Sequence, residues 1–137
     1  MSYKPSKSEI VKEILKAGKD PEYFINNYCK ISHPQEGLLP FKTYSYQNKL
    51  LKDFNVHRFN VVLKARQLGI STITAAYIVW ILLYHRDKNV LVMATKFGTA
   101  ANLVKKVKAI MKNIPEWIQI AKIEIDNRTS FELSNGS

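Results

Sequence analysis

Apolar residues recur at helical spacing near the amino terminus of the chain, in the run that begins at Ile10. Ser6 and Glu9 form a capping-box pattern just before this run, and Gly18 follows it. The pattern therefore predicts an amphipathic first helix. Residues 20–44 include three prolines and several aromatic residues, and we expect a turn-rich connector there.

The middle of the chain alternates between helical and strand-like patterns. Residues 46–54 place apolar side chains on one face, which predicts a short helix. The runs NVVLKA (60–65) and NVLVMAT (89–95) are apolar and β-rich, which predicts two buried strands. Residues 70–85 are apolar on most sides and predict a helix packed between a sheet and another layer. Residues 98–113 predict a third helix, whose remaining surface carries lysines.

Two segments near the carboxyl terminus, AKIEID and SFELSN, alternate apolar and polar residues around a turn at Asn127 and Arg128. This alternation predicts a hairpin or two edge strands. The preceding order of strand, loop, helix, strand and helix is the beginning of a βαβ fold. We therefore predict an α/β fold with a parallel sheet and a right-handed connection. A ligand of such a sheet binds at the carboxyl ends of the strands, beside the first loop.

The composition narrows the class of protein further. The chain has 137 residues, 46% of them hydrophobic, which is enough for about one domain with a modest core. Lysine and arginine total 21 against 11 acidic residues, a net charge of +10 that favours a polyanionic partner.

The single cysteine rules out an internal disulfide bond. The first residues lack the apolar core of a signal peptide, and the apolar stretch over 73–84 is too short to span a bilayer, so we expect no membrane association.

The stretch KARQLGIS (64–71) is similar to a phosphate-binding loop, but Ile70 stands where the usual motif has lysine. The amino terminus of the following helix would offer free N–H groups and a partial positive charge to phosphate. Gly69 would allow close approach, and the Ser71 hydroxyl would be a ligand for Mg²⁺. Lys64 and Arg66 could supply positive charge from the front of the loop. By spacing alone, the stretch is equally compatible with a plain strand-to-helix turn in which both cations are solvated.

Four segments that follow one another in a particular order change this balance. They are PFKTYSYQ (40–47), RQLGIST (66–72), VLVMATKFGTAANLV (90–104) and FELSNGS (131–137). Together they resemble the amino-terminal ATPase domain of the terminase large subunits of tailed bacteriophages. Those proteins are DNA-packaging motors in which a nuclease domain follows the ATPase domain. The resemblance implies a P-loop NTPase-type parallel sheet flanked by helices, here incomplete and preceded by a helical segment.

The resemblance also implies that the chain binds ATP and Mg²⁺. Tyr46 and Gln47 match an aromatic-glutamine pair that contacts adenine, while Arg66 matches an arginine that senses or stabilises charge on the phosphates and is the one candidate catalytic residue. Lys64 matches family members whose lysine stands at the front of the loop, and Ser71 would bind Mg²⁺. The residues implied to bind the cofactor are Tyr46, Gln47, Lys64, Ala65, Arg66, Gln67, Leu68, Gly69, Ile70, Ser71 and Thr72.

The resemblance divides the chain into an amino-terminal helix and lead-in segment over 1–44 and the front part of an ATPase domain over 45–137. No adjacent acidic pair occurs in the sequence, and the family needs an Asp–Glu pair for hydrolysis. We therefore expect the chain to stop before that motif, to lack the nuclease domain and to hydrolyse no appreciable ATP. The family further implies double-stranded DNA, a portal protein and a terminase small subunit as partners. It implies a ring-forming full-length protein, in the cytoplasm of the infected bacterium and at the capsid.

Two other interpretations remain open at this stage. A helicase-like motor would share the glutamine and the phosphate loop, but it usually keeps lysine after the glycine. A basic DNA- or protein-binding module that uses no nucleotide is favoured by the charge of +10 and by Ile70. The joint occurrence of Tyr46, Gln47, Arg66 and Ser71 disfavours that module.

Overall fold

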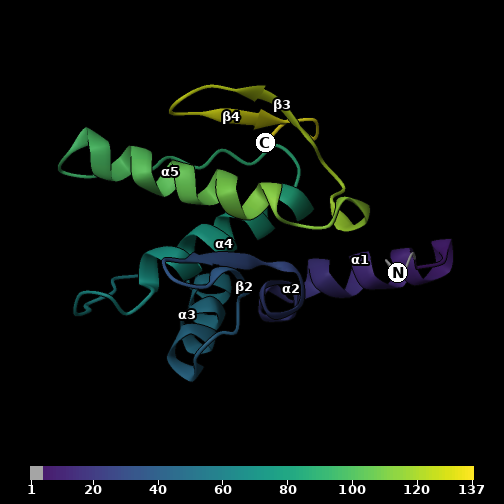
Figure 1. Cartoon of the computed structure of the whole chain (residues 1–137), viewed down its shortest axis with the longest axis horizontal. Helices are drawn as coiled ribbons and strands as arrows, with labels where there is room; N and C mark the ends of the chain where they lie inside the picture. The colour runs from purple at the N-terminus through teal and green to yellow at the C-terminus, as the bar shows by residue number, and fades with distance from the viewer. Residues whose placement is uncertain (1–4) are drawn as a thin grey trace.

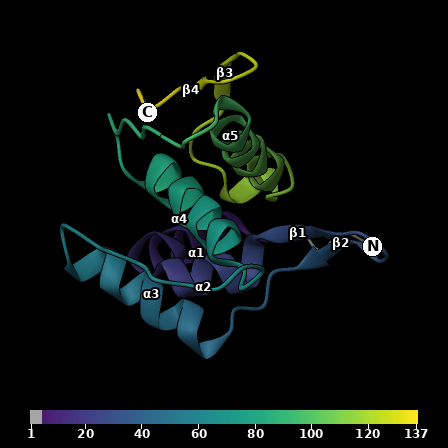
Figure 2. The same cartoon turned by 90° about the vertical axis from the view of Figure 1, so that its left-hand side faces the viewer.

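A computed structural model describes residues 5–137 of the chain. Its helices and strands are arranged as Figures 1 and 2 show. In chain order they are α1 (Lys7–Lys19), α2 (Pro21–Tyr28), β1 (Lys30–His33), β2 (Gly37–Pro40), α3 (Ser45–Val56), α4 (Ile70–Tyr84), α5 (Phe97–Lys112), the 3₁₀ turn η1 (Glu116–Ile118), β3 (Ile123–Asp126) and β4 (Phe131–Leu133).

The predicted capping box begins α1. The Glu9 carboxylate accepts a 2.7 Å hydrogen bond from the Ser6 N–H, and the Ser6 hydroxyl accepts one from the Glu9 N–H. These reciprocal bonds satisfy two N–H groups that a helix start would otherwise leave without partners. The predictions of α1, α3, α4 and α5 are confirmed, with boundaries that differ by a residue or two.

The expected turn-rich connector over 20–44 is more regular than its sequence indicated. The Asp20 carboxylate accepts hydrogen bonds from the Glu22 and Tyr23 N–H groups, and Pro21 occupies the first position of α2. An acidic N-cap followed by proline is a helix start signal, because proline has no N–H to satisfy there. The strands β1 and β2 then form an antiparallel hairpin.

The centre of the core is α4, which runs between α5 on one side and α2 and α3 on the other (Figure 2). Eight of its side chains are buried: Ile73, Ala75, Ala76, Ile78, Val79, Trp80, Leu82 and Leu83. The Trp80 indole N–H donates a 2.9 Å hydrogen bond to the Ala17 carbonyl oxygen, so α1 is attached to the same helix. A helix that is apolar on most sides is buried on most sides, as its sequence predicts. The prediction that it packs against a sheet is wrong, because its neighbours are the helices α2, α3 and α5.

The predicted parallel sheet is wrong. Within residues 5–137 the only sheets are two antiparallel pairs, β1–β2 and β3–β4, so the fold is mixed α/β with five α-helices and no P-loop-type sheet. Residues 60–65 and 89–95 form neither strand nor helix. Val61 is 100% exposed and Leu91 is 80% exposed, although the sequence predicts both runs to be buried strands. A strand needs a neighbour to receive its main-chain hydrogen bonds, and neither run has one here.

The hairpin predicted near the carboxyl terminus is confirmed as β3–β4, which lies along α5 (Figure 1). It contains an irregularity in register between Ile123 and Ile125. None of the helices described over residues 5–137 combines the length and the apolar character that crossing a membrane requires.

Candidate functional site

The predicted phosphate loop leads directly into α4. Gly69 is the N-cap of that helix and has a φ of 69°, and Gln67 also has a positive φ, of 61°. The left-handed conformation suits glycine, since it has no Cβ to clash with the following carbonyl. A Cβ placed on Gly69 would also lie 2.9 Å from Gln47 Nε2. The backbone conformation therefore favours glycine at this position, and an added Cβ would displace the Gln47 amide.

The start of α3 is attached to this loop by two hydrogen bonds. The Tyr46 hydroxyl donates to the Leu68 carbonyl oxygen at 2.7 Å, and Gln47 Nε2 donates to the Gly69 carbonyl oxygen at 3.2 Å. The Gln47 side chain is 2% exposed, and its Oε1 accepts the Tyr44 N–H at 2.9 Å. Gln47 thus joins two segments of main chain while the Tyr46 ring stays partly open to solvent.

An aromatic surface that the sequence interpretation missed lies beside the loop. The rings of Tyr44 and Tyr46 are stacked, with centroids 5.6 Å apart and planes 8° from parallel. Both rings are exposed, Tyr44 by 66%. The spacing Tyr-Ser-Tyr at a helix start was the available signal, since α3 begins at Ser45 and places the two rings on either side of that start. A planar base could stack on such a surface.

The first turn of α4 presents main-chain N–H groups next to the loop. Ile73 donates the first i to i−4 hydrogen bond of the helix, to the Gly69 carbonyl oxygen at 3.0 Å. The N–H groups of Ile70, Ser71 and Thr72 precede this bond, so they lie outside the helical i to i−4 ladder. The partial positive charge of the helix terminus is concentrated on these groups.

The cations of the loop are placed differently from Tyr46 and Gln47. Lys64 and Arg66 are exposed, and within residues 5–137 neither forms an ion pair. The Lys64 ammonium makes one local hydrogen bond, to the Ala65 carbonyl oxygen at 3.4 Å. The structure therefore brings Tyr46 and Gln47 to Leu68 and Gly69, but leaves both cations projecting into solvent at the front of the loop.

The residues present are compatible with Mg²⁺ but do not form a metal site by themselves. No cluster of three or more His, Cys, Asp or Glu side chains occurs in the part of the chain that the structure describes. The Ser71 side chain is exposed on the first turn of α4. Mg²⁺ commonly takes one or two protein ligands and completes its shell with phosphate oxygens and water. Ser71 could thus hold the ion only together with a phosphate ligand.

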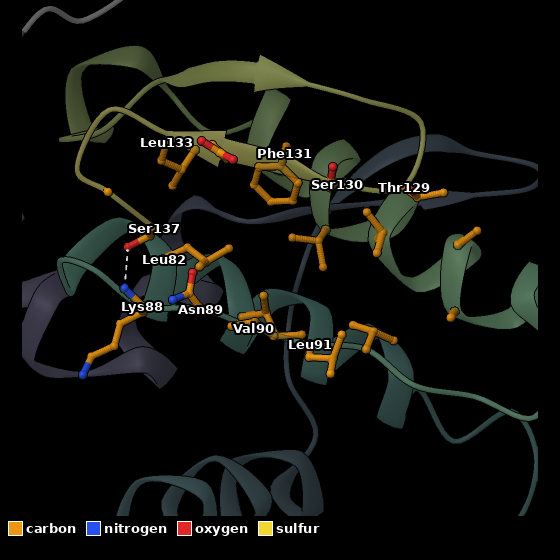
Figure 3. Close-up of a pocket in the computed structure, with 18 of the residues that line it drawn as sticks. Leu82, Lys88, Asn89, Val90, Leu91, Thr129, Ser130, Phe131, Leu133 and Ser137 are labelled. Carbon is orange, nitrogen blue, oxygen red and sulfur yellow. Dashed lines mark hydrogen bonds between the residues drawn. The ribbon is translucent and has the colours of Figure 1, made fainter.

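A hollow of about 580 Å³ lies away from this loop, between α5, β4 and the extended segment 88–92 (Figure 3). Its walls are mainly apolar and include Val90, Leu91, Phe97 and Phe131. The Lys88 N–H donates to the Ser137 hydroxyl oxygen at 3.1 Å and closes one end. None of the predicted site residues lines this hollow, which lies where the segment 89–95 lacks a neighbouring strand.

No protein-family model matches the chain. The resemblance to terminase large subunits therefore stays a prediction that depends on the order of the quoted segments. The contacts between the loop and α3 are an observation that does not depend on this resemblance.

Proposed function

We propose that the segment 64–72, which comprises the loop and the first residues of α4, binds the phosphates of ATP with Mg²⁺. We further propose that the chain is the ATP-binding part of a DNA-packaging motor similar to terminase large subunits. One observation carries this proposal: Tyr46 and Gln47 donate hydrogen bonds to the carbonyl oxygens of Leu68 and Gly69. The resemblance singled out these two segments as parts of one site. They lie 22 residues apart in the chain and are in contact in the fold.

Each part of the site has a separate task in this proposal. The N–H groups at the start of α4 donate hydrogen bonds to phosphate oxygens, and Lys64 and Arg66 fold over the outer phosphates from the solvent side. The adenine ring stacks against the surface formed by Tyr44 and Tyr46. The Ser71 hydroxyl would hold Mg²⁺, which would neutralise phosphate charge.

The proposal is for binding without turnover. Hydrolysis needs a carboxylate that activates water, and the sequence contains no adjacent acidic pair of the kind that the resemblance requires. The complete motor would translocate double-stranded DNA. By the same resemblance it would act as a ring with a portal protein and a small subunit, in the cytoplasm of an infected bacterium.

Calorimetric titration of Mg-ATP into the purified chain tests this function. Lys64→Ala and Arg66→Ala should each weaken binding about 10-fold, because each removes a charge-assisted contact. Lys52→Ala removes an exposed lysine from α3 and should leave the affinity unchanged. The absence of binding by a chain whose circular dichroism shows folded helices would overturn the proposal, as would equal affinities for all three variants.

The adenine contact has its own test. Tyr44→Ala should weaken ATP binding severalfold but leave the affinity for inorganic triphosphate unchanged, because only the base stacks on the ring. Equal losses for both ligands would assign Tyr44 to the structure of the loop and not to base binding.

The nucleotide-independent basic module remains a second candidate, and one observation favours it. Lys64 and Arg66 are exposed and form no ion pair within the described residues, as they would in a plain turn before a helix. DNA binding that depends on salt, but is unaffected by ATP and by Lys64→Ala, would support this module.

A further inference from the structure

A basic surface is formed where the β3–β4 turn lies along α5. A hollow of about 500 Å³ separates the two, and its polar lining comes from both sides. These polar residues are Asn102, Lys105, Lys108, Lys112, Asp126, Asn127 and Arg128. We call the four cations Lys105, Lys108, Lys112 and Arg128 the α5 basic face. They meet a single carboxylate, that of Asp126, so the surface is strongly cationic.

The lysines of this face are aligned by the helix. Residues 105, 108 and 112 follow the i, i+3, i+7 spacing that places side chains on one side of a helix. They extend along roughly 10 Å of the α5 axis. Phosphates of duplex DNA recur about every 3.4 Å of axis along each strand, so this length corresponds to about three phosphates. The α5 sequence contains no acidic residue that would interrupt the positive surface.

Asp126 pairs with Lys108 and Lys112, and within the described residues Lys105 and Arg128 form no ion pair. Its carboxylate accepts Lys108 at 2.7 Å and Lys112 at 3.5 Å, and the Lys108 ammonium also donates to the Asn127 carbonyl oxygen. The hydrogen bond from Lys108 lowers the pKa of the Asp126 carboxyl, which keeps it ionised. The Lys108 side chain is only 12% exposed, so Lys108 fixes the hairpin to the helix. Lys105, Lys112 and Arg128 remain exposed at the rim.

We propose that the α5 basic face binds the phosphate backbone of double-stranded DNA. The residues of α5 that line the hollow extend from Ala101 to Lys112 along the helix, which suits a backbone. Asn102 and Asn127 add amide groups to the same lining, and such amides are common partners of phosphate oxygens. The proposal rests on the proposed function in that a packaging motor must contact DNA, but it uses residues separate from the loop over 64–72.

The Asp126 carboxylate should oppose the binding of DNA at this face. It repels phosphate and holds Lys112 away from an incoming strand. Asp126→Asn should therefore tighten DNA binding about two- to threefold, while the amide can still accept the Lys108 hydrogen bond. Circular dichroism would establish that the variant remains folded. Weaker binding by folded Asp126→Asn would overturn the proposal.

The main experiment measures fluorescence anisotropy of a labelled DNA duplex over a series of salt concentrations. The triple variant Lys105→Ala/Lys112→Ala/Arg128→Ala should lower affinity at least about 10-fold at low salt. It should also reduce the magnitude of the slope of log K against log salt by about 2.7, since three phosphate contacts are lost. The control triple Lys12→Ala/Lys19→Ala/Lys52→Ala removes the same charge from exposed positions on α1 and α3 and should change affinity less than about twofold.

Equal losses in the two triples would mean that net charge alone attracts DNA, and would overturn the proposal. Competition by polyglutamate as effective as that by unlabelled DNA would overturn it in favour of an acidic protein partner. Calorimetry with Mg-ATP separates this proposal from the proposed function. ATP binding should persist in the α5 triple, and a chain that binds DNA at this face but no ATP would refute only the nucleotide site.

Discussion

Two apolar regions that are neighbours in the sequence have opposite positions in the fold. The helix α4 is buried along most of its length, whereas residues 60–65, only a few positions earlier, are exposed. A helix satisfies its main-chain hydrogen bonds internally and can be buried alone, while a strand must find them in a neighbour. Apolar content therefore predicts burial only for a segment whose main chain has partners in the same place.

The boundary between these regions passes through the candidate nucleotide site. Leu68 and Gly69, next to α4, receive hydrogen bonds from the start of α3. Lys64 and Arg66, on the side of the exposed run, have no such attachment among the described residues. The half of the loop that would bind phosphate through its main chain is thus fixed, and the half that would supply charge is open to solvent.

The largest effect is expected from a matched pair of leucines. Leu83 is fully buried in α4, so Leu83→Ala should lower the free energy of unfolding by about 2–5 kcal/mol. Leu63 lies in the exposed run, so Leu63→Ala should change it by less than about 0.5 kcal/mol. Urea unfolding followed by circular dichroism measures both. Similar losses for the two variants would mean that residues 60–65 are buried in solution, and the contrast would be wrong.

Much of the helical part of the fold could be predicted from local patterns. The capping box at Ser6 and the periodicity of α4 and α5 are short-range signals, and the structure confirms them. The predictions of buried strands at 60–65 and 89–95 are wrong for a long-range reason. The β-rich run at 60–65 has a high propensity for strand, but whether it finds a partner strand depends on the rest of the fold. The helix α2 was missed because Asp20 and Pro21 were interpreted as turn residues instead of an N-cap and first position.

A smaller effect is expected at the boundary itself. Gly69→Ala should cost about 1–2 kcal/mol, because the left-handed φ of 69° disfavours a Cβ and Gln47 Nε2 would lie 2.9 Å from it. Gly98 is in α5, and a Cβ added there would meet no other atom within 4 Å, so Gly98→Ala should stabilise the protein by up to about 1 kcal/mol. Urea unfolding of the two variants measures this opposite sign. If both variants were destabilised, the left-handed conformation at Gly69 would not explain the loss.

Some contacts at the candidate site could be anticipated from the sequence, and others could not. The resemblance brought together Tyr46, Gln47 and the loop, and the contacts of α3 with Leu68 and Gly69 agree with that proximity. The stacking of Tyr44 on Tyr46 depends on where α3 starts, which the sequence indicates only approximately. The bridge from Asp126 to two lysines of α5 joins distant segments, so no local pattern indicates it.

The stability of the contact between α1 and α2 should also depend on pH. The Tyr28 and Tyr23 hydroxyls donate to the Glu13 carboxylate at 2.5 and 2.7 Å, and they lower the pKa of that carboxyl from its ordinary 4.5. A carboxyl with a lowered pKa contributes stability above the pKa of the unfolded chain. That contribution is lost as pH falls through the lower pKa of the folded state.

Glu13→Gln should therefore lower the free energy of unfolding at pH 7 by up to about 1 kcal/mol, a modest figure because the site is largely solvent-screened. The difference from wild type should shrink steadily below about pH 4.5, where the wild-type carboxylate becomes protonated. Urea midpoints across this pH range measure it. The double variant Tyr23→Phe/Tyr28→Phe should show the same loss of acid dependence. A difference that stays constant with pH would exclude a role for Glu13 ionisation.

The smallest change in stability is expected in the exposed run, where a change in association should accompany it. Val61→Lys/Leu63→Lys should alter the free energy of unfolding by less than about 0.5 kcal/mol, since both side chains already face solvent. The same change should reduce self-association, because an exposed β-rich apolar run is an association-prone segment. Sedimentation over a range of concentrations measures it. Ser32→Lys/Gln35→Lys adds the same charge at exposed polar positions and separates the effect of the apolar run from that of net charge. If both lysine pairs reduced association equally, charge repulsion and not the unpaired strand-like segment would account for it.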